Sequence, residues 1–250
     1  MHAVLHIPHS STLIPPDILA SIVLSDPELD RELLRMTDAH TDALFAGLAD
    51  VAAPIVFPVS RLVVDPERFE DDDREPMAGR GMGVIYTETS QRSPLREKLD
   101  DRTRGQLLDR FYRPHHARLT AAVDAALERH GHCLLIDCHS FPSKPLPYEV
   151  DQSASRPDIC IGTDEFHTPP ELAALALQLF RAEGFSVELN RPFAGALVPA
   201  KHYRTDPRVS GLMVEVNRRL YIDDATGERH SMRSQRRMEK TVCEIIGLTT

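Results

Sequence analysis

Residues 134–141 read LLIDCHSF, and this stretch decides the fold. Its apolar beginning suits a strand buried in the middle of a sheet, which is typical of parallel sheets covered on both faces. The run then ends in an acid, a thiol, an imidazole and a hydroxyl. Ligands of open parallel sheets bind beyond the carboxyl ends of the strands. The stretch therefore predicts a central strand with a functional site at its end.

On both sides of this stretch, apolar runs of strand length alternate with amphipathic segments of helical length, as in repeated strand–helix units. The expected strands are Ala3–Ile7, Pro54–Phe57, Cys133–Asp137, Ile159–Ile161, Phe185–Leu189 and Gly211–Val216. The expected helices are Asp30–Ala49, Pro114–Arg129, Pro170–Ala182 and Met232–Ile246. We therefore expect an α/β fold, with an open, mostly parallel or mixed twisted sheet flanked by helices.

The chain has 250 residues, 42% hydrophobic and 27% charged, which is enough to bury the core of one α/β domain spanning residues 1–250. One segment, Asp65–Arg104, breaks the alternation with an acidic run, EDDDRE, and several glycines. This pattern predicts a long surface excursion, either a lid over a site or a mobile insertion.

The formal net charge of -9 disfavours nucleic acid or an anionic membrane as the main partner, while leaving room for a small pocket that accepts anions. No apolar segment approaches the roughly 20 residues of a membrane helix, and the N-terminus lacks a basic region before an apolar stretch. The four cysteines form no CxxC pair, which suits reduced thiols. We expect a cytoplasmic protein with a small-molecule ligand.

Two histidines, His9 and His139, follow the first and the central expected strands, so both lie at one edge of a parallel sheet. A hydrolytic zinc site typically has three protein ligands, often two histidines and a carboxylate, and an open position for water. The segment MTDAHTDALF offers the third ligand. On a helical wheel His40 lies within the apolar arc and Asp38 at its edge, so both are candidates.

Glu215 interrupts an otherwise apolar expected strand, where a solvated surface carboxylate is not expected. A carboxylate beside a metal-bound water can act as a general base. The alternative is a structural ion pair with Arg218 or Arg219. Arginines such as Arg61 and Arg218 are suited to bind a substrate carboxylate through a bidentate guanidinium.

Other polar residues near these positions have a structural and a functional interpretation. Asp137 is either a buried structural acid or, with Ser140, a support that orients a ligand. His116, in the first turn of an expected helix, either caps that helix or faces the site. Cys138 beside His139 suggests a metal-independent cysteine hydrolase, but neighbours in a strand point to opposite faces. A non-catalytic protein that binds small carboxylates on the same fold is the other alternative.

Eight segments occur in the order and approximate spacing of the N-formylglutamate amidohydrolase family, which the chain resembles. They are HIPHSS, TDAHTD, FPVSRLVVD, YRPHH, LLIDCHSF, CIGT, NRPF and EVNRRLY, within residues 6–221. The resemblance implies a fold like that of zinc carboxypeptidases and metal-dependent hydrolysis of the amide between a formyl or acyl group and glutamate. It also implies one zinc ion, although the same ligands suit other divalent metals.

Carried over residue by residue, the resemblance implies His9 and His139 as the two histidine ligands. It favours Asp38 over His40 as the acidic ligand, and it makes Glu215 the catalytic glutamate. The expected substrate is a small N-acyl amino acid that carries a carboxylate.

The chain departs from the family pattern in two segments. In DPER, Glu67 stands where members tend to have asparagine, while Arg68 is kept. In NRPFAGA, Arg191 stands in place of a glycine and Ala194 in place of a lysine. Both segments are expected to face the substrate, with Arg68 and Arg191 binding its carboxylate, so the preferred acyl group or amino acid can differ from formylglutamate.

Overall fold

The computed structural model describes residues 1–230 and 233–249. Within these ranges the strands form a six-stranded sheet in the order β2-β1-β3-β6-β4-β5. The strands are β1 (Ala3–Ile7), β2 (Ala52–Val56), β3 (Cys133–Phe141), β4 (Ile159–Gly162), β5 (Val187–Leu189) and β6 (Val209–Asn217). The first four strands of that order are parallel, whereas β4 pairs with β6 in the antiparallel direction. The expected open α/β sheet flanked by helices is confirmed.

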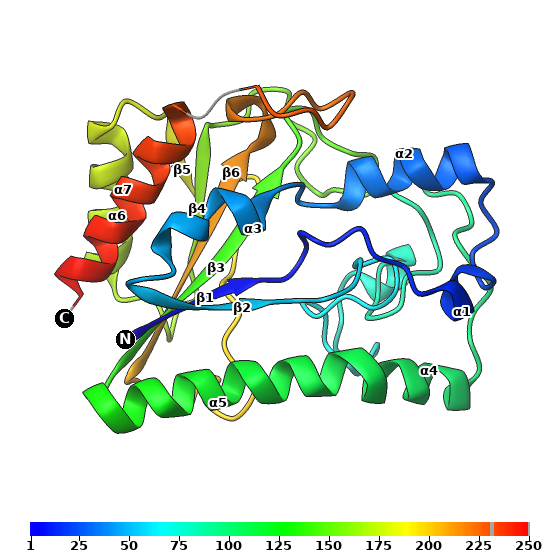
Figure 1. The fold of residues 1–250 in the computed structure, drawn as a ribbon, viewed down its shortest axis with the longest axis horizontal. Helices are drawn as coiled ribbons and strands as arrows, with labels where there is room; N and C mark the ends of the chain where they lie inside the picture. The colour runs from blue at the N-terminus through cyan, green and yellow to red at the C-terminus, as the bar shows by residue number, and fades with distance from the viewer. Residues whose placement is uncertain (231–232, 250) are drawn as a thin grey trace.

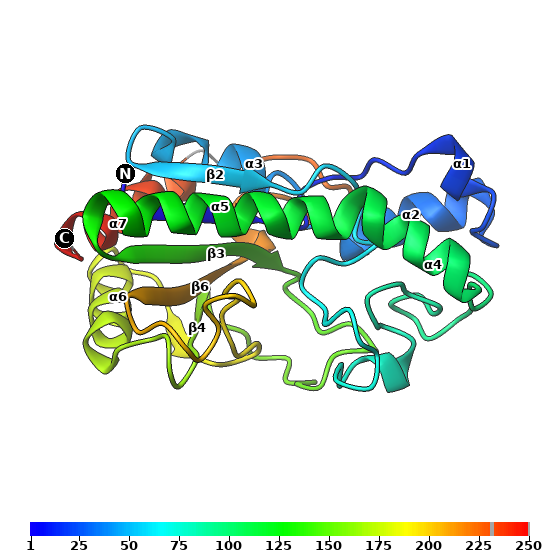
Figure 2. The same cartoon turned by 90° about the horizontal axis from the view of Figure 1, so that it is seen from below.

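Helices cover both faces of this sheet. A long helix, α5 (Arg113–His130), lies along one face, preceded by α4 (Asp101–Leu107) and a π-helical turn at Leu108–Tyr112 (Figures 1 and 2). The other face is covered by α6 (Pro170–Ala182), α7 (Arg233–Leu248) and the short α3 (Thr41–Leu44) (Figure 1). The remaining elements are α1 (Pro16–Leu19), α2 (Asp26–Met36) and the 3-10 turns Ala46–Leu48, Ala78–Arg80 and Arg218–Leu220.

The central strand β3 is buried along its whole length, and its side chains alternate between two cores. Leu134, Ile136 and Cys138 pack on the side of α6 and α7. Leu135 packs on the side of α5. Because strand side chains alternate with a period of two, His139 points to the α5 side as well.

Two of the expected elements, β1 and α6, have the bounds that the sequence predicts. The main strands β3 and β6 run further than expected, so His139 lies inside β3 rather than after it. The ladder between β3 and β6 continues to the pair Phe141 and Asn217, because backbone pairing does not require apolar side chains. The expected start of the last helix, Met232, lies outside the described residues.

The prediction of one helix over Asp30–Ala49 is wrong. A capping box formed by Ser25 and Glu28 begins α2 four residues earlier, at Asp26. The helix ends at Met36, and the chain reaches α3 through a turn in which His40 has a φ of 63°. A left-handed residue cannot continue a right-handed helix, so the apolar period of this segment spans two helices separated by a turn.

The segment Asp65–Arg104, predicted to be a long surface excursion, is partly exposed and partly packed against the rest of the chain. It has little regular structure, but Met82, Tyr86 and Leu95 are buried and form a core with residues of α2. The exposed residues include the acidic run at 71–74 and residues 91–94. Among the described helices, none is long and apolar enough to cross a membrane.

Candidate active site

Three parallel strands bring the expected catalytic side chains to one edge of the sheet, on the side of α2 (Figure 1). His9 lies two residues beyond the end of β1. His139 and Glu215 are direct neighbours in the ladder between β3 and β6. All three side chains are buried, and the alternation of the strands directs His139 and Glu215 away from the core that holds Cys138.

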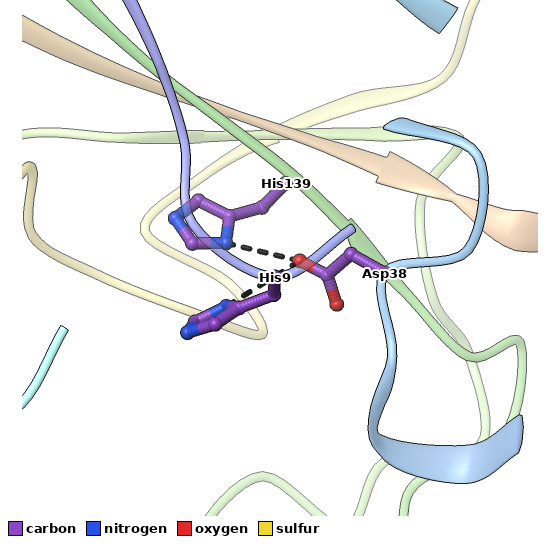
Figure 3. A group of neighbouring side chains, drawn as sticks. All are labelled: His9, Asp38 and His139. Carbon is purple, nitrogen blue, oxygen red and sulfur yellow. Dashed lines mark hydrogen bonds and ion pairs between the residues drawn. The ribbon is translucent and has the colours of Figure 1, made fainter. Parts of the chain in front are cut away.

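Asp38 reaches the same point from the turn between α2 and α3. Its backbone N–H donates to the carbonyl of His9 over 2.9 Å, which ties this turn to the chain that leaves β1. One carboxylate oxygen, Oδ2, then lies 3.1 Å from Nδ1 of His139 and 3.6 Å from Nδ1 of His9 (Figure 3). One potential ligand atom of each residue lies within 4.8 Å of those of the other two.

The far nitrogen of each imidazole contacts a second carboxylate. Nε2 of His9 lies 2.8 Å from Asp65, and Nε2 of His139 lies 3.1 Å from Asp137. A carboxylate behind a ligating histidine fixes the ring orientation and directs the lone pair of the other nitrogen to the metal. Both rings therefore present Nδ1 to the space beside Asp38.

The donor set fits a divalent metal ion. Nδ1 of His9 is buried and has no hydrogen-bond partner among the described residues. Leaving such an atom unsatisfied costs roughly 1–3 kcal/mol, so the site is built for a further partner. Two imidazole nitrogens and one carboxylate oxygen are a ligand set that zinc accepts in catalytic sites.

The carboxylate of Asp38 is held in its ionised form. Burial alone would raise its pKa, but hydrogen bonds and charge interactions with His139 and His9 outweigh burial and lower the pKa well below its usual range. Nη2 of Arg218 lies 3.2 Å from its other oxygen, Oδ1. The backbone N–H of Ser140 donates to Oδ2 over 3.2 Å. These contacts fix both oxygens of Asp38.

Glu215 is the buried acid of the site. Burial raises its pKa to about 8, against the charge of His139, which lowers it, while the charge of Asp38 raises it further. Its Oε2 is buried with no hydrogen-bond partner among the described residues. A carboxyl with a pKa near neutral can both take up and release a proton, which is what general acid–base catalysis requires.

A cavity of about 440 Å³ opens beside this cluster. Its lining contains five charged side chains besides the residues above: Arg35, Arg61, Glu67, Arg68 and Glu149. Apolar side chains, among them Phe141, Pro192, Phe193 and Met213, complete it. A larger and more open cavity lies between residues 124–128 and 201–208, and it contains none of the expected site residues.

The arginines of the cavity differ in their partners. Arg61 binds Asp65 through Nε and Nη2, and it also donates to Tyr86, so its charge supports the carboxylate that holds His9. Arg68 lies 3.9 Å from Asp65 and 4.0 Å from Glu75, and its Nε is buried without a hydrogen-bond partner among the described residues. Arg68 is therefore better placed than Arg61 to bind an incoming carboxylate.

The structure corrects the expectation for Arg191. Its guanidinium is half-exposed and pairs with Asp151 and Glu188 at the surface. Its neighbours Asn190 and Pro192 line the cavity, whereas Arg191 does not. The segment 190–192 therefore reaches the cavity, but the side chain of Arg191 lies at the protein surface.

Two expected histidines lie apart from the cluster. Nε2 of His40 contacts the carbonyl of Gly227 at 3.2 Å, and His40 is not part of the group formed by His9, Asp38 and His139. Nε2 of His116 donates to the carbonyl of Pro66 over 3.0 Å, and burial lowers the pKa of His116 to about 4. His116 thus holds the segment that carries Glu67 and Arg68 without lining the cavity.

Cys138 is fully buried on the opposite face of β3 from His139, and burial raises the pKa of its thiol well above the usual value. A nucleophilic cysteine needs a thiolate and access to substrate. Both are absent for Cys138, which argues against the cysteine hydrolase.

Sequence reasoning gave no specific role to His6, Asp65 or Glu67. Asp65 and Glu67 lie in a segment without periodicity, which gave no orientation for their side chains. His6 could have been found, because alternation along β1 places it on the same face as Val4, toward α5. It pairs with Asp137 in the ladder, and the two side chains meet at 2.9 Å.

Comparison with known proteins places the chain among amidohydrolases of formylated amino acids. The family model for N-formylglutamate amidohydrolase matches residues 1–222. An N-formylglutamate deformylase of Pseudomonas aeruginosa is 26% identical over 226 residues, which cover 87% of this chain and 80% of that protein.

Solved structures agree with this match. The crystal structure of N-formylglutamate amidohydrolase from Ralstonia eutropha JMP134 has a TM-score of 0.85 and 27% identity, covering 99% of this chain and 94% of that one. A gene product of Agrobacterium tumefaciens has the same fold, with a TM-score of 0.69, 18% identity and coverage of 99% and 89%. The likeness to zinc carboxypeptidases stays a prediction.

Proposed function

Since the chain belongs to the N-formylglutamate amidohydrolase family, we propose that it is a metal-dependent amidohydrolase acting on a small N-formyl or N-acyl amino acid that carries a carboxylate. The observation that carries the proposal is the convergence of His9, Asp38 and His139, with the unsatisfied Nδ1 of His9 at its centre. The family match includes each of these residues and Glu215.

In this proposal His9, Asp38 and His139 hold one divalent ion, for which zinc is preferred because of the ligand set. When bound, such an ion lowers the pKa of a coordinated water toward ~7 and polarises the scissile carbonyl. Asp65 and Asp137 keep the two rings in position. Arg218 holds the carboxylate of Asp38.

Glu215 moves the proton. It accepts a proton from the attacking water and returns it to the departing amide nitrogen, for which its raised pKa is suited. Arg68, with its weakly satisfied guanidinium at the cavity wall, binds the substrate carboxylate. The apolar side of the cavity, with Phe141 and Phe193, faces the rest of the substrate.

The test is metal content together with release of free amino acid from N-formylglutamate, before and after chelation. We expect bound divalent metal and turnover that stops on chelation and returns with added zinc. Turnover that persists after complete removal of metal would contradict the proposal. Metal without turnover of N-formylglutamate would direct the assay to other N-acyl amino acids, and failure with all of them would contradict it too.

Replacement of Glu215 by glutamine separates chemistry from metal binding. We expect Glu215→Gln to keep its metal and to lose at least about 100-fold in kcat, because positioned acid–base groups contribute about 10²- to 10⁴-fold. Glu171→Gln, on the exposed side of α6, is the matched control and should keep the parent rate. A parent rate in Glu215→Gln would show that another group moves the proton.

A further inference from the structure

A second cluster of potential metal ligands lies beside the first. It contains His6 of β1, Asp137 of β3 and Glu67 of the segment that follows β2. Nδ1 of His6 lies 2.9 Å from Oδ1 of Asp137 and 3.0 Å from Oε1 of Glu67. His6 and Asp137 are fully buried, and Glu67 lines the cavity. None of these contacts is needed for the ligand set of the first site.

Two donor atoms at this cluster are unsatisfied. Oε1 of Glu67 and Nε2 of His139 are buried, and although each lies near an oppositely charged group, neither makes a hydrogen bond of good geometry among the described residues. This Nε2 lies 3.1 Å from Asp137 and 3.9 Å from Glu67. Four atoms, two imidazole nitrogens and two carboxylate oxygens, thus face one small buried volume.

The ring of His6 has a further partner on its other side. Nε2 of His6 lies 2.8 Å from Nε2 of His115, which α5 directs toward the sheet. His115 stays neutral because burial, followed by the charge of His6, lowers its pKa to about 2. One arrangement of this pair has Nε2 of His6 donating to Nε2 of a neutral His115. The lone pair of a neutral His6 then lies on Nδ1, directed at the two carboxylates.

The charge of the cluster favours a cation. Asp137 and Glu67 bring two carboxylates to one buried point. The nearby Arg218 and Arg61 form their ion pairs with Asp38 and Asp65 instead.

We propose that His6, Glu67 and Asp137 form a second site for a divalent cation, with the ring of His139 between the two sites. Nδ1 of His139 faces the first site, and Nε2 faces the second. The mixed nitrogen and oxygen donors suit zinc, manganese, cobalt or iron rather than calcium. The inference shares His139 and Asp137 with the proposed function and otherwise rests on different residues, His6 and Glu67.

The experiment is a titration of chelator-stripped protein with Zn²⁺ in equilibrium dialysis, followed by elemental analysis. We expect two ions per chain in the parent and one in Glu67→Gln. Glu70→Gln, three residues away in the same segment and outside the cavity lining, is the matched control and should bind two. His9→Ala should also bind one, but at the second site.

These variants keep the two sites distinguishable. If the parent saturates at one ion and Glu67→Gln binds the same number, the second site does not exist, and the function proposed above is untouched. If His9→Ala binds as many ions as the parent, the first site fails instead. Circular dichroism checks that Glu67→Gln is folded, and His6→Gln provides a second test that should also bind one ion.

A second measurement uses Mn²⁺ as the probe. Two manganese ions separated by one imidazole ring should broaden each other's electron paramagnetic resonance signal at two equivalents. The signal of Glu67→Gln should stay that of an isolated ion. An isolated-ion signal in the parent at saturation would overturn the proposal.

Discussion

Asp65 serves two partners at once: one oxygen contacts Nε2 of His9, and the other receives Nε and Nη2 of Arg61. Tyr86 donates to that second oxygen as well. Burial opposes ionisation of Asp65, but the charges of Arg61 and His9 lower its pKa well below the usual range. A single carboxylate therefore connects His9 to the core of the segment 65–104.

Replacing Asp65 by asparagine should weaken metal binding without removing a ligand. Loss of a carboxylate behind a ligating histidine typically costs 10- to 100-fold in metal affinity, and we expect a loss of that size in Asp65→Asn. Competition with a chromophoric chelator measures it. The exposed Asp73→Asn, in the same segment, is the control. Equal affinities for the two variants would show that Asp65 does not orient His9.

Among the helices and strands, the sequence predicted the bounds of those whose apolar residues recur with a regular period. The bounds of β1 and α6 follow from an unbroken apolar pattern, with a proline at the start of α6. Around Asp38 the apolar residues recur with a helical period on both sides of a turn. The sequence pattern therefore gave no sign of the turn or of the left-handed conformation of His40. His9, His139 and Glu215 could be found because each lies at or near a strand end. Asp65 and Glu67 could not, because only tertiary packing orients them.

Two glycines beside helices should respond in opposite directions to the same substitution. Gly131 follows α5 with a φ of 78°, where a side chain is strained, although no atom would meet its Cβ. Gly105 lies inside α4, also with open space around a Cβ. We expect Gly131→Ala to lower the free energy of unfolding by about 1 kcal/mol and Gly105→Ala to raise it by about 0.5–1 kcal/mol.

Urea denaturation of the two variants and the parent measures these changes. Each of the two variants serves as the control for the other, because both replacements add one methyl group outside the candidate site. A loss of stability in Gly105→Ala would mean that its surroundings in α4 are tighter than the structure shows.

At the scale of the whole molecule, buried titratable groups set the pH range of stability. The folded pKa of His116, about 4, is below the unfolded value of about 6.5. The unfolded chain therefore takes up a proton first as the pH falls, so stability is lost between pH 6.5 and 4. His6 acts in the opposite direction: its raised pKa, about 9, gives stability that is present below pH 6.5 and lost as the pH rises toward 9.

We expect the metal-free protein to be most stable near pH 6.5 and His116→Gln to be less sensitive to acid. Between pH 6.5 and 4.5 the variant should lose less free energy of unfolding than the parent, by about 2 kcal/mol. Urea denaturation at both pH values measures the difference. The exposed His230→Gln is the control and should follow the parent. Parallel losses in all three proteins would show that His116 does not titrate as its burial implies.

The alternation of β3 side chains between two faces also affects how the protein can evolve by substitution. From Leu134 to His139, the even positions contact the core under α6 and α7, and the odd positions 137 and 139 lie in the candidate site. β6 repeats the arrangement, with Val214 in the same core and Glu215 in the site. Substitutions at the even positions therefore change mainly the stability of the fold, while substitutions at the odd positions change mainly the candidate site. A residue inserted into β3 would turn the following side chains to the opposite face, so that core residues would face the site and site residues would face the core. Both the packing and the site would then be lost.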